Sequence, residues 1–217
     1  MSVVYLVILF VVGYLLGSVN VSAIVTKCVG KCDITKVGSG NAGGTNVARA
    51  IGAKWGITVI LIEIIKSTGL GLIGRWVFPA DILGWGECGA LFSGLVAVLG
   101  CFVGNRLPCF NNFKGGKGVT VGAALAIVID WRVFAVLISL FLIIFLITHI
   151  VSIASVIAAI GIPVSAAILY GGRPYGVYPV IIASVITLGI VLGHLPNIKR
   201  LINGTENRFE FGKGKKK

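Results

Sequence analysis

The chain has 217 residues, of which 57% are apolar and only 12% carry a charge. Soluble globular domains have about 25% charged residues, so these proportions exclude an ordinary soluble protein. Apolar runs of roughly 17 to 25 residues, the length that crosses about 30 Å of hydrocarbon, recur along the chain. They predict an all-α integral membrane protein with one domain over residues 1–217 and no soluble domain of useful size.

The first apolar run, Ser2–Thr26, has the position of a secretory signal peptide. It lacks a preceding basic segment, its apolar stretch is too long, and no small-residue cleavage site follows it. We therefore expect it to be retained as the first membrane-spanning helix.

Hydropathy along the chain predicts seven spans in total. Their approximate bounds are Ser2–Thr26, Gly56–Val77, Cys88–Gly104, Gly118–Asp130, Trp131–His149, Ser152–Tyr170 and Val177–Gly193. The fourth is the weakest, because it is short and almost continuous with the fifth. Six spans remain the alternative.

Basic residues are divided unevenly between the two sets of connections that seven spans define. Of the 19 Lys and Arg residues, fifteen fall in segments 27–55 and 105–117, the turn at 149–151 and the tail from His194. Only Arg75, Arg132 and Arg173 fall in the other set. Because cytoplasmic loops are enriched in Lys and Arg, this bias predicts an N-terminus outside and a cytoplasmic C-terminus. It also accounts for much of the net charge of +12 without nucleic acid as a partner.

The first cytoplasmic segment contains "VGSGNAGGTNVARAIG", Val37–Gly52. Its glycines allow the backbone to aim several N–H groups at one point, its hydroxyl and amide side chains add donors, and Arg49 can hold a phosphate through two parallel hydrogen bonds. The other residues with this chemistry are Gly38, Ser39, Gly40, Asn41, Gly43, Gly44, Thr45 and Asn46. A simple glycine-rich turn is the alternative, because the segment matches no P-loop.

Two further polar segments are predicted on the same face, "LPCFNNFKGGKGVT" at Leu107–Thr120 and "GHLPNIKRLINGTENRF" at Gly193–Phe209. In "KGGKG", Lys114 and Lys117 enclose two glycines at the start of the fourth span, where backbone amides of a helix N-terminus point toward an anion. Lysines beside a span can also serve only as topology signals that extend to the interface. Three donor-rich segments on one face together predict a site for more than one phosphate.

A few polar residues lie inside predicted spans. Ser152 and Ser155 begin the sixth span, where serine is typical of helix–helix packing. Glu63 and Lys66 are three residues apart in the second span, a spacing that allows an ion pair on a helix. Since isolated charges in a membrane are costly, we expect this pair to face the bundle near the site.

Residues for several common chemistries are missing. The chain has two histidines, His149 and His194, and no G-x-S-x-G motif, so no hydrolytic triad is predicted. Its five cysteines form no C-x-x-C pair and its seven acidic residues are scattered, so we expect neither a metal nor another cofactor. A phosphate site built from amides, Lys and Arg remains.

The stretches "GSGNAGGTNVAR", "PCFNNFKGGKG" and "HLPNIKRLINGTE" resemble the three signature motifs of the bacterial acyl-phosphate:glycerol-3-phosphate acyltransferases, the PlsY family. The resemblance covers essentially the whole chain. It implies transfer of a fatty acyl group from acyl phosphate to the 1-hydroxyl of sn-glycerol 3-phosphate, giving lysophosphatidic acid and phosphate. It also implies the first step of phospholipid synthesis at the cytoplasmic face of the bacterial inner membrane, and functional coupling to the enzyme that makes acyl phosphate.

The resemblance further implies roles for individual residues. Arg49 and Lys117 are expected to bind phosphate, Asn41 and Ser155 to lie near the acyl phosphate, and His194 and Asn197 to position glycerol 3-phosphate. Arg49, Lys117, His194, Asn197 and Asn41 form the expected catalytic set. The expected substrate-binding set is Ser39, Gly40, Thr45, Asn46, Lys114, Gly115, Gly116, Ser155 and Glu206, the last with a possible structural role.

The second motif departs from the family pattern, which usually begins G-H-x-x-P. Aligning on "VLG" places Cys101 at the histidine, whereas aligning on Pro108 places Asn105 there. If the histidine only orients a phosphate or a loop, Asn105 can donate a hydrogen bond in its place. Two alternatives to the active enzyme remain. One is a transporter for an organophosphate or another anion, and the other is a catalytically weakened family member that binds substrate without forming product.

Overall fold

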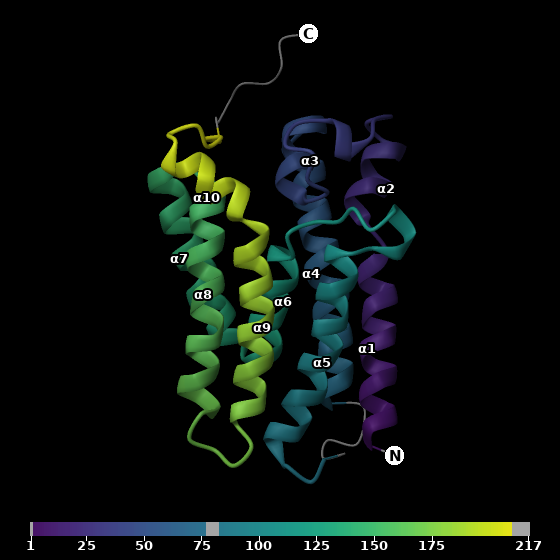
Figure 1. The fold of residues 1–217 in the computed structure, drawn as a ribbon, viewed down its shortest axis with the longest axis vertical. Coiled ribbons are helices and arrows are strands. Elements are labelled where there is room, and N and C mark those ends of the chain that lie inside the picture. The colour runs from purple at the N-terminus through teal and green to yellow at the C-terminus, as the bar shows by residue number, and fades with distance from the viewer. Residues whose placement is uncertain (1, 77–82, 210–217) are drawn as a thin grey trace.

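The computed structural model describes residues 2–76 and 83–209, and in these ranges the chain is helical without strands (Figure 1). The longer helices are α1 (Ser2–Ser18), α4 (Ala53–Trp76), α5 (Glu87–Arg106), α7 (Trp131–Thr148), α8 (Val151–Tyr170) and α9 (Val177–Gly193). The shorter elements are α2 (Val21–Cys28), η1 (Ile34–Lys36), α3 (Gly44–Ile51), η2 (Cys109–Asn111), α6 (Val119–Ile129) and α10 (Leu195–Ile202).

The long helices form an up-and-down bundle in which α6 lies between two groups, α1, α4 and α5 on one side and α7, α8 and α9 on the other (Figure 1). Glycines allow α1 and α5 to pack closely. A Cβ at Gly17 would lie 2.8 Å from the Cα of Cys101, and one at Gly104 would lie 2.7 Å from the backbone N of Ser18. Such small residues at helix contacts are typical of membrane proteins, where close backbone packing drives helix association.

The described helices confirm a multi-pass membrane protein. Five segments are long and apolar enough to cross a bilayer, and a sixth arises if α9 and α10, which meet at 50°, form one bent span. The prediction of seven spans is not confirmed by length. Its fourth member is α6, whose 11 residues extend only about 16 Å, roughly half of the hydrocarbon thickness.

The predicted first span is broken into α1 and α2. Asn20 begins α2 by accepting a hydrogen bond from the backbone N–H of Ala23 at 3.0 Å. At the break, the carbonyl of Val19 accepts a hydrogen bond from Lys66, whose ammonium lies 3.0 Å from the carboxylate of Glu63. The predicted Glu63–Lys66 ion pair is therefore confirmed, and it supplies partners to backbone groups that a continuous helix would have satisfied itself.

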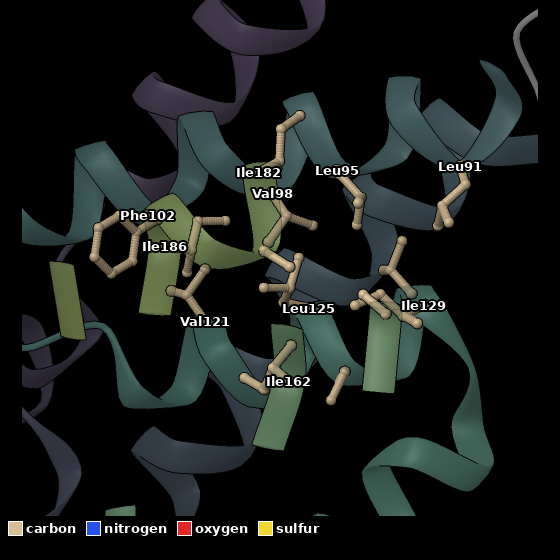
Figure 2. Close-up of a cluster of buried hydrophobic side chains, with 14 of the residues drawn as sticks. Leu91, Leu95, Val98, Phe102, Val121, Leu125, Ile129, Ile162, Ile182 and Ile186 are labelled. Carbon is tan, nitrogen blue, oxygen red and sulfur yellow. The ribbon is translucent and has the colours of Figure 1, made fainter. Parts of the chain in front are cut away.

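The short helix α6 is fixed by apolar packing against its neighbours and by a cap at its C-terminal end. Val121, Leu125 and Ile129 are fully buried against α5, α8 and α9, as Figure 2 shows for the central apolar cluster. At its C-terminal end, the guanidinium of Arg75 donates to the carbonyls of Val128 and Ile129. Together with the Tyr170 hydroxyl, which donates to the Ile129 carbonyl at 3.4 Å, this cap satisfies carbonyls at the end of α6.

The polar elements gather at one end of the bundle. In Figure 1, α2, α3 and α10 lie at the end opposite to the one where α1 begins, and the segment from 107 to 118 passes beside them. The three motif segments identified from the sequence are therefore brought together.

Candidate active site

A cavity of about 250 Å³ lies where the three motif segments meet. Its polar end is lined by the loop before α3, the residues before α6 and the start of α10. Its apolar part continues between α4, α6, α7 and α8, with side chains such as Ile64, Ala126, Leu137 and Ile162. A site with one wet, cationic end and one apolar groove suits an amphiphile with a charged head.

Eleven of the fourteen predicted site residues line this cavity. They are Ser39, Asn41, Thr45, Asn46, Arg49, Gly116, Lys117, Ser155, His194, Asn197 and Glu206. Gly40, Lys114 and Gly115 are not among its lining residues. Lys114 is exposed, and Gly115 packs against the backbone of Arg106, where a Cβ would lie 2.7 Å from the carbonyl oxygen.

Asn46 organises the loop before α3. Its side chain is 2% exposed, its Oδ1 accepts from the backbone N–H of Ser39 at 2.9 Å, and its Nδ2 donates to the carbonyls of Ile34 and Val37 at 3.3 and 2.9 Å. Gly38 has a φ of 60° and leaves no room for a Cβ beside the Asn46 amide. The side-chain amide of Asn46 is thus used to shape the loop that carries Ser39 and Asn41.

Replacing Asn46 with Ala is expected to lower the melting temperature and weaken acyl transfer together. The change removes the side-chain partner of the Ser39 N–H and of the buried Ile34 carbonyl, and one of two partners of the Val37 carbonyl. A buried backbone group left unpaired costs about 1–3 kcal/mol. Thermal unfolding in detergent and an activity assay on the same preparation measure both effects. Asn203→Ala is the matched control, since Asn203 is exposed after α10; equal melting temperatures for the two variants would contradict the role.

Lys117 is tied to the third motif by a chain of hydrogen bonds. Its Nζ donates to Oδ1 of Asn197, and Nδ2 of Asn197 donates to Oε1 of Glu206 at 2.6 Å. Glu206 also accepts from Ser152 at 3.0 Å and from Arg200 at 2.8 Å. These contacts join the loop before α6, the start of α8 and α10 into one polar wall.

The electrostatics of this wall favour an anion. The pKa of Lys117 is lowered to about 8, mainly by burial, with Glu206 opposing the shift and Arg200, Arg49 and Arg106 adding to it. Arg49 lines the cavity half-buried, and no described carboxylate forms an ion pair with it. A phosphate entering here would compensate cations that the protein itself leaves incompletely paired.

Glu206 remains ionised in this setting. Burial alone raises the pKa of its carboxyl, but hydrogen bonds from Asn197, Arg200 and Ser152 outweigh burial and leave the pKa below its ordinary value. Its ion pair is with Arg200, and its charge also favours the charged forms of Lys117 and Arg49.

His194, which follows α9, is held as a neutral imidazole. It is 3% exposed, its Nδ1 donates to the carbonyl of Ile190 at 2.8 Å, and burial lowers its pKa to about 4. With the proton on Nδ1, its Nε2 is an acceptor at the cavity. The residue is suited to orienting a hydroxyl group and is a weak base at neutral pH.

Of the two candidates in the second motif, Asn105 is the one that borders the cavity. Asn105 lines the cavity and its Nδ2 donates to Oε2 of Glu63 at 3.4 Å, whereas Cys101 is fully buried against α1. Sequence reasoning did not assign the cavity residues Arg200 and Ser22 to the site. For Arg200 a signal existed: it lies three residues after Asn197 on α10, so both face the same side of that helix.

Among residues 2–76 and 83–209, no group of three or more His, Cys, Asp or Glu side chains is placed to hold a metal ion.

Comparison with known proteins agrees with the motif resemblance. A family model described as glycerol-3-phosphate acyltransferase matches residues 7–204. The glycerol-3-phosphate acyltransferase of Chlorobaculum tepidum is 35% identical, over 94% of this chain and 97% of that protein. The enzyme of the same name from Enterococcus faecalis is 38% identical, over 98% and 95%.

Solved structures show the same architecture. The crystal structure of PlsY, an integral membrane glycerol 3-phosphate acyltransferase, in its glycerol 3-phosphate form has a TM-score of 0.80 and 35% identity, covering 94% of this chain and 96% of that one. Its lysophosphatidic acid form has a TM-score of 0.77 and 34% identity, covering 94% and 95%. The family model, the relatives and the fold agree over nearly the whole chain, which therefore belongs to the glycerol-3-phosphate acyltransferase family.

Proposed function

We propose that this protein transfers a fatty acyl group from acyl phosphate to the 1-hydroxyl of glycerol 3-phosphate, releasing lysophosphatidic acid and phosphate. The observation that carries the proposal is the cavity itself, in which Arg49, Lys117 and Arg200 surround the polar end of an apolar groove. Two phosphates and one acyl chain are the chemistry that this division of the cavity fits. Relatives crystallised in glycerol 3-phosphate and lysophosphatidic acid forms support the acceptor and the product.

Each part of the site has a role in this reaction. Arg49, Lys117 and the donors of the first loop, Ser39 and Thr45, hold phosphate, and Asn41 and Ser155 lie beside the donor. Asn197 and His194 position glycerol 3-phosphate. Nε2 of His194 accepts a hydrogen bond from the 1-hydroxyl of this substrate. Acyl phosphate is already activated, so attack by the hydroxyl expels phosphate without a covalent enzyme intermediate.

The proton of the attacking hydroxyl goes to the phosphate of the donor. His194, with a pKa of about 4, is too weak a base to take it at neutral pH, whereas the phosphate of the donor becomes more basic as its bond to the acyl group breaks. The protein then contributes orientation and the positive charge that stabilises the developing negative charge on the leaving phosphate.

The membrane arrangement forms part of the proposal. Seven crossings result if α6 and the loop before it together count as one, with the N-terminus outside and the polar end of the bundle in the cytoplasm. The bias of Lys and Arg toward that end supports this orientation in the bacterial inner membrane. There the site would receive glycerol 3-phosphate from the cytosol and acyl phosphate from the enzyme that produces it.

Purified protein with palmitoyl phosphate and labelled glycerol 3-phosphate, without added metal, provides the direct test. Steady formation of lysophosphatidic acid and phosphate in equal amounts is the expected result. Binding of glycerol 3-phosphate without product would identify a catalytically weakened member. Uptake of glycerol 3-phosphate into proteoliposomes without acyl transfer would replace the enzyme with a transporter.

Bulk added in the apolar groove is expected to change the preferred acyl length. Ala126 lines the groove on α6, seven residues after the helix begins at Val119 and hence about 10 Å along it. Ala126→Leu is therefore expected to lower the rate with palmitoyl phosphate several-fold more than the rate with octanoyl phosphate. The ratio of the two rates is independent of how much protein is folded, and an unchanged ratio would show that the chain lies elsewhere.

A further inference from the structure

The buried pair of Glu63 and Lys66 connects three segments that are distant in sequence. Oε1 of Glu63 accepts from the backbone N–H of Val21 at 3.4 Å, and Lys66 donates to the carbonyl of Val19 at 2.7 Å. Glu63 is 4% exposed and lies 3.0 Å from Lys66, so its carboxylate is neutralised inside the bundle. The pair thus holds the break between α1 and α2.

The same carboxylate reaches the loop of the second motif through Asn105. Oε2 of Glu63 accepts from Nδ2 of Asn105 at 3.4 Å, and the backbone carbonyl of Asn105 accepts from the N–H of Gly116 at 2.9 Å. A Cβ on Gly116 would lie 3.0 Å from both Oδ1 of Asn105 and the carbonyl oxygen of Ala42. The residue immediately before Lys117 is therefore fixed between the first loop and the end of α5.

We propose that Glu63 and Lys66 are a positioning pair for the transfer reaction, acting through Asn105 to fix the loop that presents Lys117 to the cavity. The expected effects of the pair on the reaction rate rest on the proposed function. Glu63 borders the cavity but its carboxylate is occupied by Lys66, Val21 and Asn105. The pair belongs to the framework of the site, and the cation that meets phosphate is Lys117.

The position of Lys117 determines the charges that it faces. Glu206, Arg200, Arg49 and Arg106 all act on its charge, and the neutral His194 borders the same cavity. A loop released from Asn105 would expose Lys117 to water and bring its pKa back toward the ordinary lysine value. The alkaline limb of kcat/KM, which reports the free enzyme, then moves upward.

Two variants test the pair, so that the test does not depend on the folding of either variant alone. Asn105→Ala leaves the ion pair intact and removes only its link to the carboxylate, whereas Glu63→Gln removes the charge. Glu87→Gln is the matched control, since Glu87 is a carboxylate that pairs with Arg75 and Arg173 at the opposite end of the bundle. The measurements are kcat/KM above pH 7 and hydrogen exchange of residues 107–118.

For Asn105→Ala and Glu63→Gln, kcat/KM is expected to fall on the order of 10- to 100-fold, because misplacing a catalytic group by about 1 Å has such effects. The alkaline limb should rise by about one pH unit, and exchange in 107–118 should accelerate. The control should match the wild type in all three.

An unchanged alkaline limb together with unchanged exchange in 107–118 would overturn the positioning role, even if the variants were less stable. Wild-type protein that makes no lysophosphatidic acid would instead contradict the proposed function. The exchange measurement needs no turnover and would still decide whether Glu63 and Asn105 hold the Lys117 loop.

Discussion

Replacing Lys117 with Ala is expected to lower kcat/KM for acyl transfer by about 100- to 1000-fold, the range seen when one donor to a developing negative charge is removed. Lys117 lines the cavity between the first and third motifs and is the lysine of "KGGKG" whose ammonium is held by Asn197. Removing it takes away a fixed cation that no neighbouring lysine can replace, since Lys114 is exposed outside the cavity.

The matched control for this loss is Lys114→Ala. Both variants lose one positive charge from the same loop, but only Lys117 borders the cavity. We expect the Lys114 variant to stay within about threefold of the wild type, as for an exposed charge that only attracts anionic substrate. Equal losses in the two variants would mean that the charge of the loop, and not the placement of Lys117, supports the reaction.

The wild-type pH profile tests the same assignment. Because burial lowers the pKa of Lys117 to about 8, its cationic form decreases as the pH rises through about 8. If the cation binds phosphate, kcat/KM decreases over the same range, and this decrease should be absent from the residual activity of Lys117→Ala. A wild-type kcat/KM that stays constant to pH 10 would contradict a role for the charged amine.

Hydropathy located most of the spanning helices well, because long apolar runs in a bilayer have few alternatives to a helix. The bounds predicted for Val177–Gly193 coincide with α9, and those of the fifth and sixth spans differ from α7 and α8 by one residue. The break at Asn20 could not be found in this way. It depends on Lys66 and Glu63, which are distant in sequence and replace the lost helical hydrogen bonds.

The site was predictable to the extent that its residues carry recognisable chemistry. Arg49, Lys117, His194 and Asn197 were expected from motif and charge, and the fold brings all four to one cavity. What sequence alone left open was how each polar group is used. The amide of Asn46 could bind a ligand or shape a loop, and only its three backbone partners show that it does the latter.

Asn197→Asp is expected to lower kcat/KM for acyl transfer more than Asn197→Ala does. The two side chains of Asn and Asp have nearly the same shape, so the exchange tests charge with little change in packing. Asn197 accepts from Lys117 through Oδ1 and donates to Glu206 through Nδ2 at 2.6 Å. Aspartate keeps the first contact, loses the second, and places a second carboxylate beside Glu206.

This new charge acts on phosphate binding in two ways. It pairs with Lys117 and so competes with substrate phosphate for the ammonium, and it adds a negative charge beside the phosphate site. We expect kcat/KM to fall by on the order of 100-fold or more, and Asn197→Ala, which merely removes the link, to fall by less. Any residual activity of the aspartate variant should persist to higher pH, because a neighbouring carboxylate raises the pKa of Lys117. An aspartate variant as active as the alanine variant would show that the added charge has no effect on the reaction, and that phosphate does not approach this wall.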